Sequence, residues 1–139
     1  MFELLLPFFL VVSVIMTLTI IWRIKARKYI SSGTVASAYD AWTQDKLLER
    51  LWGEHIHLGF YPSGKKSIDF REAKVKFVHE LVKWSSLDKL PKGSRILDVG
   101  CGIGGSSRIL AEYYGFNVTG ITISPAQVKR ARELTPNGL

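Results

Sequence analysis

The stretch Ile96-Leu97-Asp98-Val99-Gly100-Cys101-Gly102-Ile103-Gly104-Gly105 decides the fold of this chain. Its opening, together with Arg95, is a short apolar run that predicts a strand, and the glycines that follow predict a turn. Residues 106–114 then predict a helix. A strand that passes through a glycine turn into a helix brings backbone amides and a helix N-terminus to the carboxyl edge of a sheet, where open α/β folds bind ligands.

The residues after this turn repeat the order of elements. Gly115 stands where a helix C-cap belongs, and residues 117–123 predict a second strand. Ser124 is a candidate N-cap for a helix over residues 125–134, and Gln127 stands where a capping box places Glu or Gln. The order β-α-β-α implies a parallel sheet with right-handed crossovers. We therefore predict the α/β fold class with a Rossmann-like arrangement.

The residues before the turn predict helices and one loop. After a break at residues 31–33, apolar side chains recur at helical intervals up to Trp52 and predict one interrupted helix. Residues 53–64 are rich in turn-forming and aromatic residues and predict an ordered loop. Residues 69–84 predict an amphipathic helix, with an apolar stripe formed by Ala73, Phe77, Leu81 and Trp84.

The N-terminal segment 4–22 carries no charged side chain. Its length is close to the roughly 20 apolar residues that a helix needs to cross a bilayer. Basic residues follow the segment and do not precede it, which is typical of a signal-anchor and not of a cleaved signal peptide. We predict a single-pass transmembrane signal-anchor over residues 1–24. The positive-inside rule then places the rest of the chain in the cytoplasm, and a buried core helix is the alternative.

Net charge and cysteine content narrow the function classes. The formal net charge is +7 at pH 7. Outside the basic flank at residues 23–28 the charged residues are scattered, so we expect no nucleic-acid partner. The flank itself favours membrane lipid with anionic head groups. The single cysteine, Cys101, excludes an internal disulfide framework and a Cys-based zinc site.

The glycine turn admits more than one ligand. Gly100, Gly102 and Gly105 satisfy the dinucleotide pattern G-x-G-x-x-G, which alone is a weak signal. Asp98 places a carboxylate beside the ligand, where it repels a pyrophosphate and attracts a cation. S-adenosylmethionine has an ammonium and a sulfonium group and no phosphate. Thr122 also stands where a dinucleotide site expects an acid, so we favour the methyl donor over a dinucleotide or a purely structural turn.

The sequence resembles a known family over residues 34–139. ILDVGCGIGGSSRILAEYYGFNVTGITISPAQVKRA (residues 96–131) resembles the start of the class I methyltransferases. AYDAWTQDKLLERLWGEHIHLGFY (residues 38–61) resembles the tocopherol-type quinol methyltransferases. The resemblance implies an S-adenosyl-L-methionine-dependent C-methyltransferase of cyanobacterial type. Its implied substrate is a prenylated hydroquinone of the 2-methyl-6-phytyl-1,4-hydroquinone type, in tocopherol and plastoquinone biosynthesis at a plasma or thylakoid membrane.

The resemblance also implies which residues hold the donor. Thr122 and Gln127 are candidates for binding the ribose hydroxyls, and Tyr39 for a helix that lies over the donor. The alternatives are an ordinary strand residue at Thr122, a capping box at Gln127 and a core aromatic at Tyr39. The predicted cofactor-binding residues are Asp98, Val99, Gly100, Cys101, Gly102, Ile103, Gly104, Gly105, Thr122, Gln127 and Tyr39.

Three residues of the loop are candidates for the chemistry. Methylation of a ring carbon needs an oriented ring and removal of a proton, which Glu54, His55 or His57 can accept. Histidine is favoured because its unperturbed pKa is near neutral. The alternative is that these side chains only hydrogen-bond the loop backbone. We expect no metal, because a tetrahedral site needs more partners and the one remaining histidine, His79, lies on another predicted element.

The predicted organisation has three parts: the anchor at residues 1–24, a helical N-terminal cap region at 25–92, and the start of the Rossmann-like donor-binding domain at 93–139. Two strands do not make a stable parallel sheet by themselves. We therefore expect a truncated chain that is inactive on its own. The rival functions are an NAD(P)-dependent membrane-anchored oxidoreductase and an inactive interaction module.

Overall fold

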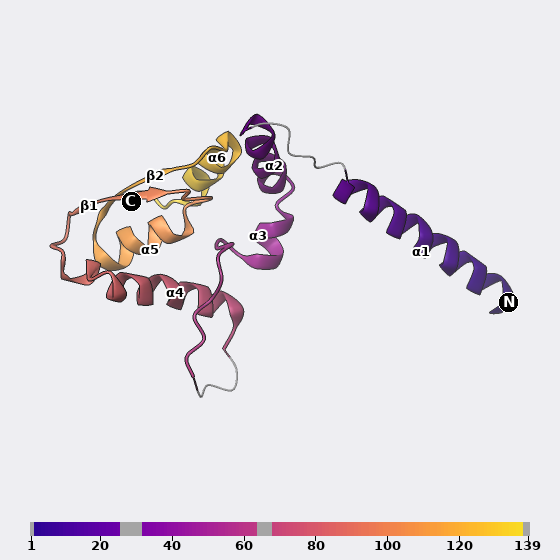
Figure 1. Ribbon diagram of the computed structural model, residues 1–139, viewed down its shortest axis with the longest axis horizontal. Coiled ribbons are helices and arrows are strands. Elements are labelled where there is room, and N and C mark those ends of the chain that lie inside the picture. The colour runs from indigo at the N-terminus through magenta and orange to yellow at the C-terminus, as the bar shows by residue number, and fades with distance from the viewer. Residues whose placement is uncertain (1, 26–31, 64–67, 138–139) are drawn as a thin grey trace. The chain divides into compact units, whose positions relative to one another are not determined.

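The computed structural model describes residues 2–25, 32–63 and 68–137 (Figure 1). The chain divides into two compact units, Met1–Ala38 and Tyr39–Leu139. The helices and strands are α1 (Phe2–Lys25), α2 (Ser32–Gln44), α3 (Leu47–Trp52), α4 (Phe70–Trp84), the 3-10 turn η1 (Leu87–Lys89), β1 (Arg95–Val99), α5 (Gly105–Tyr114), β2 (Asn117–Ile121) and α6 (Pro125–Leu134).

Helix α1 contains the whole charge-free segment predicted to be a membrane anchor. The hydroxyls of Thr17 and Thr19 donate to the carbonyl oxygens four residues earlier, at 2.8 and 2.7 Å, so neither needs a partner outside the helix. Among the residues that the structure describes, however, no helix has the length and apolar character required to cross a membrane. The helical part of the prediction is confirmed and the transmembrane part is not. Two basic residues of its flank, Arg27 and Lys28, lie outside the described ranges.

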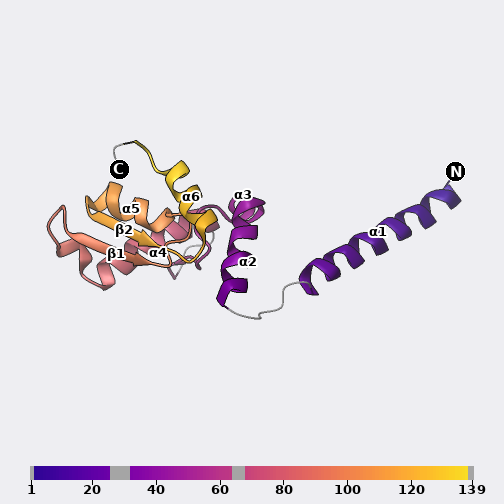
Figure 2. The ribbon, with the colours of Figure 1, turned by 90° about the horizontal axis from the view of Figure 1, so that it is seen from above.

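The second unit is built on a parallel pair of strands joined by a helix. β1 and β2 pair in parallel, with Arg95 opposite Asn117 and Val99 opposite Ile121. Helix α5 forms the crossover and packs along the pair (Figure 2). The predicted β-α-β-α order is confirmed, but β2 ends two residues earlier than predicted. The Ile121 carbonyl closes the ladder by accepting from Gly100 N and Cys101 N, at 2.8 and 3.0 Å, after which the chain leaves the sheet.

The core of this unit lies where α4 and α5 meet the strands. Val82, Leu110 and Phe116 form its buried centre. Helix α4 begins after Asp69, whose carboxylate accepts from two backbone amides of the first turn, at 2.9 and 3.3 Å. The predicted apolar stripe of α4 is largely wrong, because Trp84 is 83% exposed and Phe77 and Leu81 are also exposed. The helix instead buries the face formed by Ala73, Lys74, Val78 and Val82.

The predicted interrupted helix before Trp52 is two helices, α2 and α3. The break falls at Lys46, which has a left-handed backbone with φ +54°. Asp45 begins the second helix by accepting from Leu47 N at 2.9 Å. The side chain of Asp45 thus competes with the helical backbone at this point, and the helix is interrupted. The helical spacing of apolar residues nevertheless runs across the break.

The N-terminus of α6 is closed by three side chains. Ser124, fully buried, accepts from Gln127 N at 3.1 Å and donates to Asp40 Oδ1 at 2.5 Å. Asp40 Oδ1 also accepts from Ala126 N at 3.0 Å, which attaches the last turns of α2 to α6. The predicted capping box is only half correct. Its second bond, expected from Gln127, is made by Thr122, whose Oγ1 accepts from Ser124 N at 3.3 Å.

We expect Ser124→Ala to lower the free energy of unfolding by about 1 kcal/mol, the usual cost of losing an N-cap. The variant also deprives Asp40 of one of its two donors. Urea denaturation of the wild type and variant measures the difference. Ser85→Ala is the matched control, because Ser85 is exposed and its hydroxyl bonds to carbonyls of its own helix. Equal losses in the two variants would contradict the role given to Ser124.

Candidate functional site

A cavity of about 600 Å³ opens at the carboxyl ends of β1 and β2. Its volume is that of a site for a ligand of cofactor size. All predicted cofactor-binding residues except Gly104 line this cavity, and so do the three predicted catalytic candidates. Gly104 is buried, and a Cβ there would lie 2.9 Å from the Arg108 guanidinium. The structure therefore brings the predicted residues from four separate segments to one place.

The turn after β1 leaves its backbone open to the cavity. Gly100 and Gly102 have φ values of +81° and +57°, which side chains rarely adopt. A Cβ added at either position meets no atom within 4 Å. This open space lets a ligand approach the backbone of the turn at the start of α5.

The Asp98 carboxylate stands at the floor of the cavity, at the end of β1. Ser107 Oγ donates to Asp98 Oδ2 at 2.6 Å and fixes its orientation. An ionised carboxylate accepts several hydrogen bonds, so Asp98 keeps acceptor capacity toward a ligand. A cation that enters the cavity therefore meets a preoriented negative group.

Thr122 and Gln127 lie side by side on the cavity wall beyond β2. Thr122 Oγ1 donates to Gln127 Oε1 at 2.6 Å. This bond occupies the hydroxyl proton of Thr122 and turns the Gln127 amide so that its nitrogen remains as the donor group. The pair thus presents one oxygen acceptor and one amide donor, which suits neighbouring ligand hydroxyls.

Aromatic side chains of α2 form another wall of the cavity. Tyr39 packs edge to face against Trp42, with ring centroids 5.4 Å apart, and both residues line the cavity. The bond between Asp40 and Ser124 holds this end of α2. Tyr39 therefore lies in the wall of the cavity and its ring packs against Trp42, while its role toward a donor stays a prediction.

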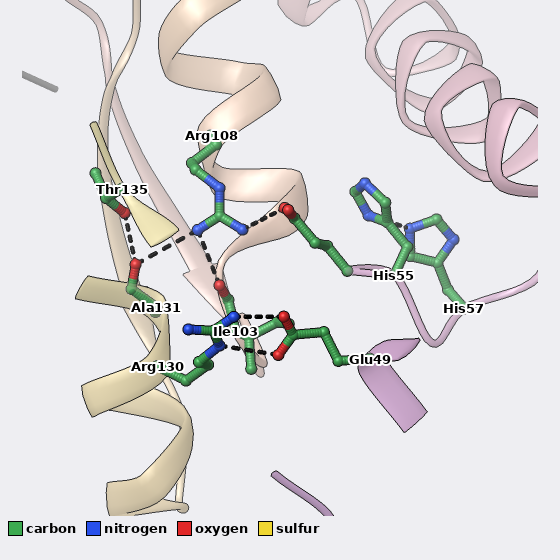
Figure 3. A network of polar contacts seen from close by, with 9 residues as sticks. Glu49, His55, His57, Ile103, Arg108, Arg130, Ala131 and Thr135 are labelled. Atoms are coloured by element: carbon green, nitrogen blue, oxygen red, sulfur yellow. Dashed lines mark hydrogen bonds and ion pairs between the residues drawn. The ribbon is translucent and has the colours of Figure 1, made fainter. Parts of the chain in front are cut away.

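Two arginines that the sequence analysis did not single out hold α3 and the loop after it (Figure 3). Arg108 ties the loop to the glycine segment, and Arg130 ties α3 to α6. Arg108, 8% exposed, donates to Glu54 Oε2 at 2.5 Å and to the Ile103 carbonyl at 2.9 Å. Arg130 forms two bonds with Glu49, at 2.5 and 2.9 Å, and these hold the pKa of Glu49 below its usual value. Glu54, predicted as an acid/base candidate, is therefore engaged in an ion pair.

Lys74 of α4 also holds the loop that follows α3. Its side chain is 4% exposed, and Nζ donates to the carbonyls of Trp52 and His55 at 3.0 and 2.7 Å. The ammonium also lies 5.3 Å from the centroid of the Trp52 ring. Burial lowers the pKa of Lys74, and Arg71 adds to this effect. These contacts fix the backbone on which His55 is carried.

The two histidines of the loop are bonded to each other (Figure 3). His57 Nε2 lies 3.2 Å from His55 Nδ1, and His57 Nδ1 lies 2.9 Å from the Leu58 carbonyl. Burial lowers the pKa of His55 to about 4, and the neighbouring His57 contributes to the shift. At neutral pH, His55 is therefore an uncharged imidazole in the wall of the cavity.

The remaining titratable candidates have structural partners. His79 Nδ1 is 2.7 Å from the Tyr114 hydroxyl. Burial, together with the nearby Asp98, raises the pKa of Cys101, which makes the thiol a poor nucleophile. Within the described ranges, no three His, Cys, Asp or Glu side chains are arranged to hold a metal ion.

We expect acid to destabilise the protein partly through His55. Its pKa is about 4 in the folded chain against an ordinary value of 6.5. Between these values the unfolded chain binds a proton that the folded chain does not, so the free energy of unfolding falls as the pH falls through this window. Urea midpoints at pH 7.5, 5.5 and 4.5 measure the loss. His55→Gln should flatten the curve, and parallel curves for wild type and His55→Gln would contradict the assignment.

Comparison with known proteins finds methyltransferases among the proteins that this chain resembles. The family described as "Mycolic acid cyclopropane synthetase" matches residues 61–137. The 2-methyl-6-phytyl-1,4-hydroquinone methyltransferase of Synechocystis is 61% identical over 116 residues, which are 84% of this chain and 36% of that protein. The probable tocopherol O-methyltransferase of Oryza sativa is 40% identical over 104 residues, 72% of this chain and 28% of that protein. The chain thus spans about a third of the length of these curated relatives.

Two solved structures share the fold. A putative sarcosine dimethylglycine methyltransferase from Galdieria sulphuraria matches with a TM-score of 0.57 and 30% identity, over 68% of this chain and 36% of that one. The [4+2]-cyclase SpnF matches with a TM-score of 0.62 and 28% identity, over 74% of this chain and 37% of that one. Because one of the two is described as a cyclase, the fold alone does not fix the reaction. The chain has the class I methyltransferase fold, and its function must be argued from the site.

Proposed function

We propose that this chain, which belongs to the mycolic acid cyclopropane synthetase family, binds S-adenosylmethionine in the cavity at the ends of β1 and β2 as part of a methyltransferase. The observation that carries the proposal is the preoriented Asp98 carboxylate beside an open glycine turn. A carboxylate in this position favours an ammonium over a pyrophosphate. The names of the relatives, which are methyltransferases, agree with this ligand.

Each part of the cavity fits one part of the donor. Asp98 accepts from the ammonium, and the backbone of Gly100 and Gly102 lies against the methionine portion. Thr122 and Gln127 bind the ribose hydroxyls with the acceptor and donor that their mutual bond leaves available. Tyr39 closes the site from α2. When bound, the donor supplies an electrophilic methyl group on a sulfonium.

For the acceptor, we propose a prenylated hydroquinone of the 2-methyl-6-phytyl-1,4-hydroquinone type, methylated at a ring carbon. The support is the 61% identity to a protein named for this substrate. The segment WGEHIHLG, which resembles the tocopherol-type methyltransferases, supplies Glu54, His55 and Ile56 to the cavity wall next to the glycine turn. This role belongs to tocopherol and plastoquinone biosynthesis.

We further propose that α1 holds the protein at a membrane, with the remainder of the chain on the cytoplasmic side. From Phe9 to Trp22 every large apolar side chain of α1 is at least 37% exposed. A quinol with a long prenyl tail partitions into lipid, so a protein at the bilayer surface meets it there. Flotation with anionic vesicles tests this: the protein should rise with the vesicles and a variant lacking residues 2–25 should not. Equal flotation of both would contradict the proposal.

Titration calorimetry with S-adenosylmethionine tests the donor site directly. We expect one site per chain in the full-length protein, and no quenching of NADH fluorescence on addition of the same protein. Radiolabelled methyl transfer to 2-methyl-6-phytyl-1,4-hydroquinone then tests the acceptor. Binding of NADH without binding of the methyl donor would overturn the assignment in favour of a dinucleotide enzyme.

A further inference from the structure

The hydrogen bonds of the histidine pair determine where its protons lie. The Leu58 carbonyl can only accept, so His57 Nδ1, at 2.9 Å, must carry a hydrogen. In neutral His57 the other nitrogen, Nε2, is then an acceptor. Its partner at 3.2 Å, His55 Nδ1, must therefore donate. It follows that neutral His55 has its hydrogen on Nδ1 and a lone pair on Nε2.

The lone pair on His55 Nε2 remains available in the part of the chain that the structure describes, since no side chain or backbone group there is hydrogen-bonded to it. His55 belongs to the wall of the proposed donor cavity. Its ring lies against the start of α5, where a Cβ on Gly105 would be 2.8 Å from His55 Cε1. A basic atom is thus held beside the glycine turn.

The surroundings of the two rings differ. His55 faces the cations Lys74 of α4 and Arg108 of α5, as well as Glu54 of its own loop, and burial keeps its pKa low. His57 donates to the Leu58 carbonyl oxygen, and its ring centroid lies 5.3 Å from that of Phe77. The contact between His55 Nδ1 and His57 Nε2 gives a proton that arrives at His55 a path to His57.

We propose that His55 and His57 form a proton relay for the methyl transfer, with His55 Nε2 as the acceptor atom facing the substrate. The proposal rests on the proposed function. Replacement of a ring hydrogen by methyl, with conversion of the sulfonium to a neutral thioether, releases one proton. The bond from that proton to the substrate breaks as the bond to His55 Nε2 forms. The Nδ1 proton of His55 moves to His57 Nε2, and the imidazolium of His57 returns its proton to water by the same path after the product leaves.

Long-range proton–nitrogen NMR of labelled imidazoles tests the arrangement without any turnover. At pH 7.5 we expect His55 as the neutral tautomer with its hydrogen on Nδ1, and a hydrogen on Nδ1 of His57. Single-histidine replacements assign the signals. A hydrogen on Nε2 of His55, or a cationic His55 at this pH, would overturn the proposal.

His57→Gln separates a relay from a purely structural bond. Glutamine still accepts a hydrogen bond from His55 Nδ1 but takes up no proton. We expect kcat for methyl transfer by the full-length protein to fall by about 100-fold, the lower end of the range for a general base, with unchanged affinity for S-adenosylmethionine by calorimetry. His79→Gln, which alters a histidine bonded to Tyr114, should keep the wild-type rate.

The outcomes distinguish this proposal from the function on which it rests. A wild-type protein that neither binds the donor nor transfers methyl contradicts the proposed function, and the relay with it. A wild-type protein that does both, with His57→Gln within twofold of its rate, contradicts the relay alone. Slow turnover in His57→Gln with intact donor binding supports both.

Discussion

Replacing Asp98 by alanine should weaken binding of S-adenosylmethionine by about tenfold to a hundredfold, the range for losing a hydrogen bond to a charged group. The carboxylate is oriented by Ser107 at 2.6 Å and lines the cavity beside the open turn at Gly100. Because the donor's ammonium carries a full charge, loss of this acceptor leaves the cation without a counter-charge. Titration calorimetry at constant ionic strength measures the change.

Two further variants identify the cause of that change. Asp98→Asn keeps the shape of the side chain and removes its charge, so it should also lose affinity. Ser107→Ala removes the orienting hydroxyl but keeps the carboxylate, so its affinity should fall less than that of either Asp98 variant. If Ser107→Ala and Asp98→Ala bind equally weakly, loss of local structure explains both. Undiminished binding by Asp98→Ala would remove the main support for a methyl-donor site.

The sequence predicted the part of the fold that depends on local patterns. β1 was predicted with its observed limits, and α5, its Gly115 cap and the Ser124 cap of α6 were predicted to within a residue. Each of these depends on a few adjacent residues. The buried face of α4 was predicted wrongly because hydrophobicity alone selected Trp84 over Lys74. Lys74 is buried because two loop carbonyls accept its ammonium hydrogens, and sequence spacing does not reveal them.

The candidate site was likewise predicted where it depends on a local motif and missed where it depends on residues distant in the sequence. The turn residues, Thr122 and Gln127 were predicted from a motif and a resemblance, and the structure brings them to one cavity. Arg108 and Asp40 were missed, because their partners are distant in the sequence: Arg108 and Glu54 are 54 residues apart. Asp40 and Ser124 are 84 residues apart. No periodicity or motif links such pairs, so only the folded chain identifies them. The predicted domain boundaries and the roles of the site residues stay predictions.

Gly105→Ala should lower the free energy of unfolding by about 1–3 kcal/mol, as overpacking of a close contact does. In an ordinary helix the same change stabilises by about 0.5–1 kcal/mol, because glycine loses more backbone entropy on folding. At Gly105 a Cβ would lie 2.9 Å from the Glu54 carbonyl and 2.8 Å from His55 Cε1. The carbonyl cannot move alone, since Glu54 is bonded to Arg108 and the adjacent His55 carbonyl to Lys74. The loop that carries the histidine pair must shift.

The sign of the change in the free energy of unfolding therefore distinguishes two cases. A loss of stability means that the loop packed on α5 requires glycine at position 105, and a gain means that it does not. Urea denaturation of Gly105→Ala, with Ser106→Ala as a control in the same helical turn, measures it. In a His55→Ala background the cost should shrink without vanishing, because the ring contact is removed and the contact with the Glu54 carbonyl remains. A Gly105→Ala protein as stable as the wild type would mean that the loop does not rest on α5 in solution, and the relay would then lack its support.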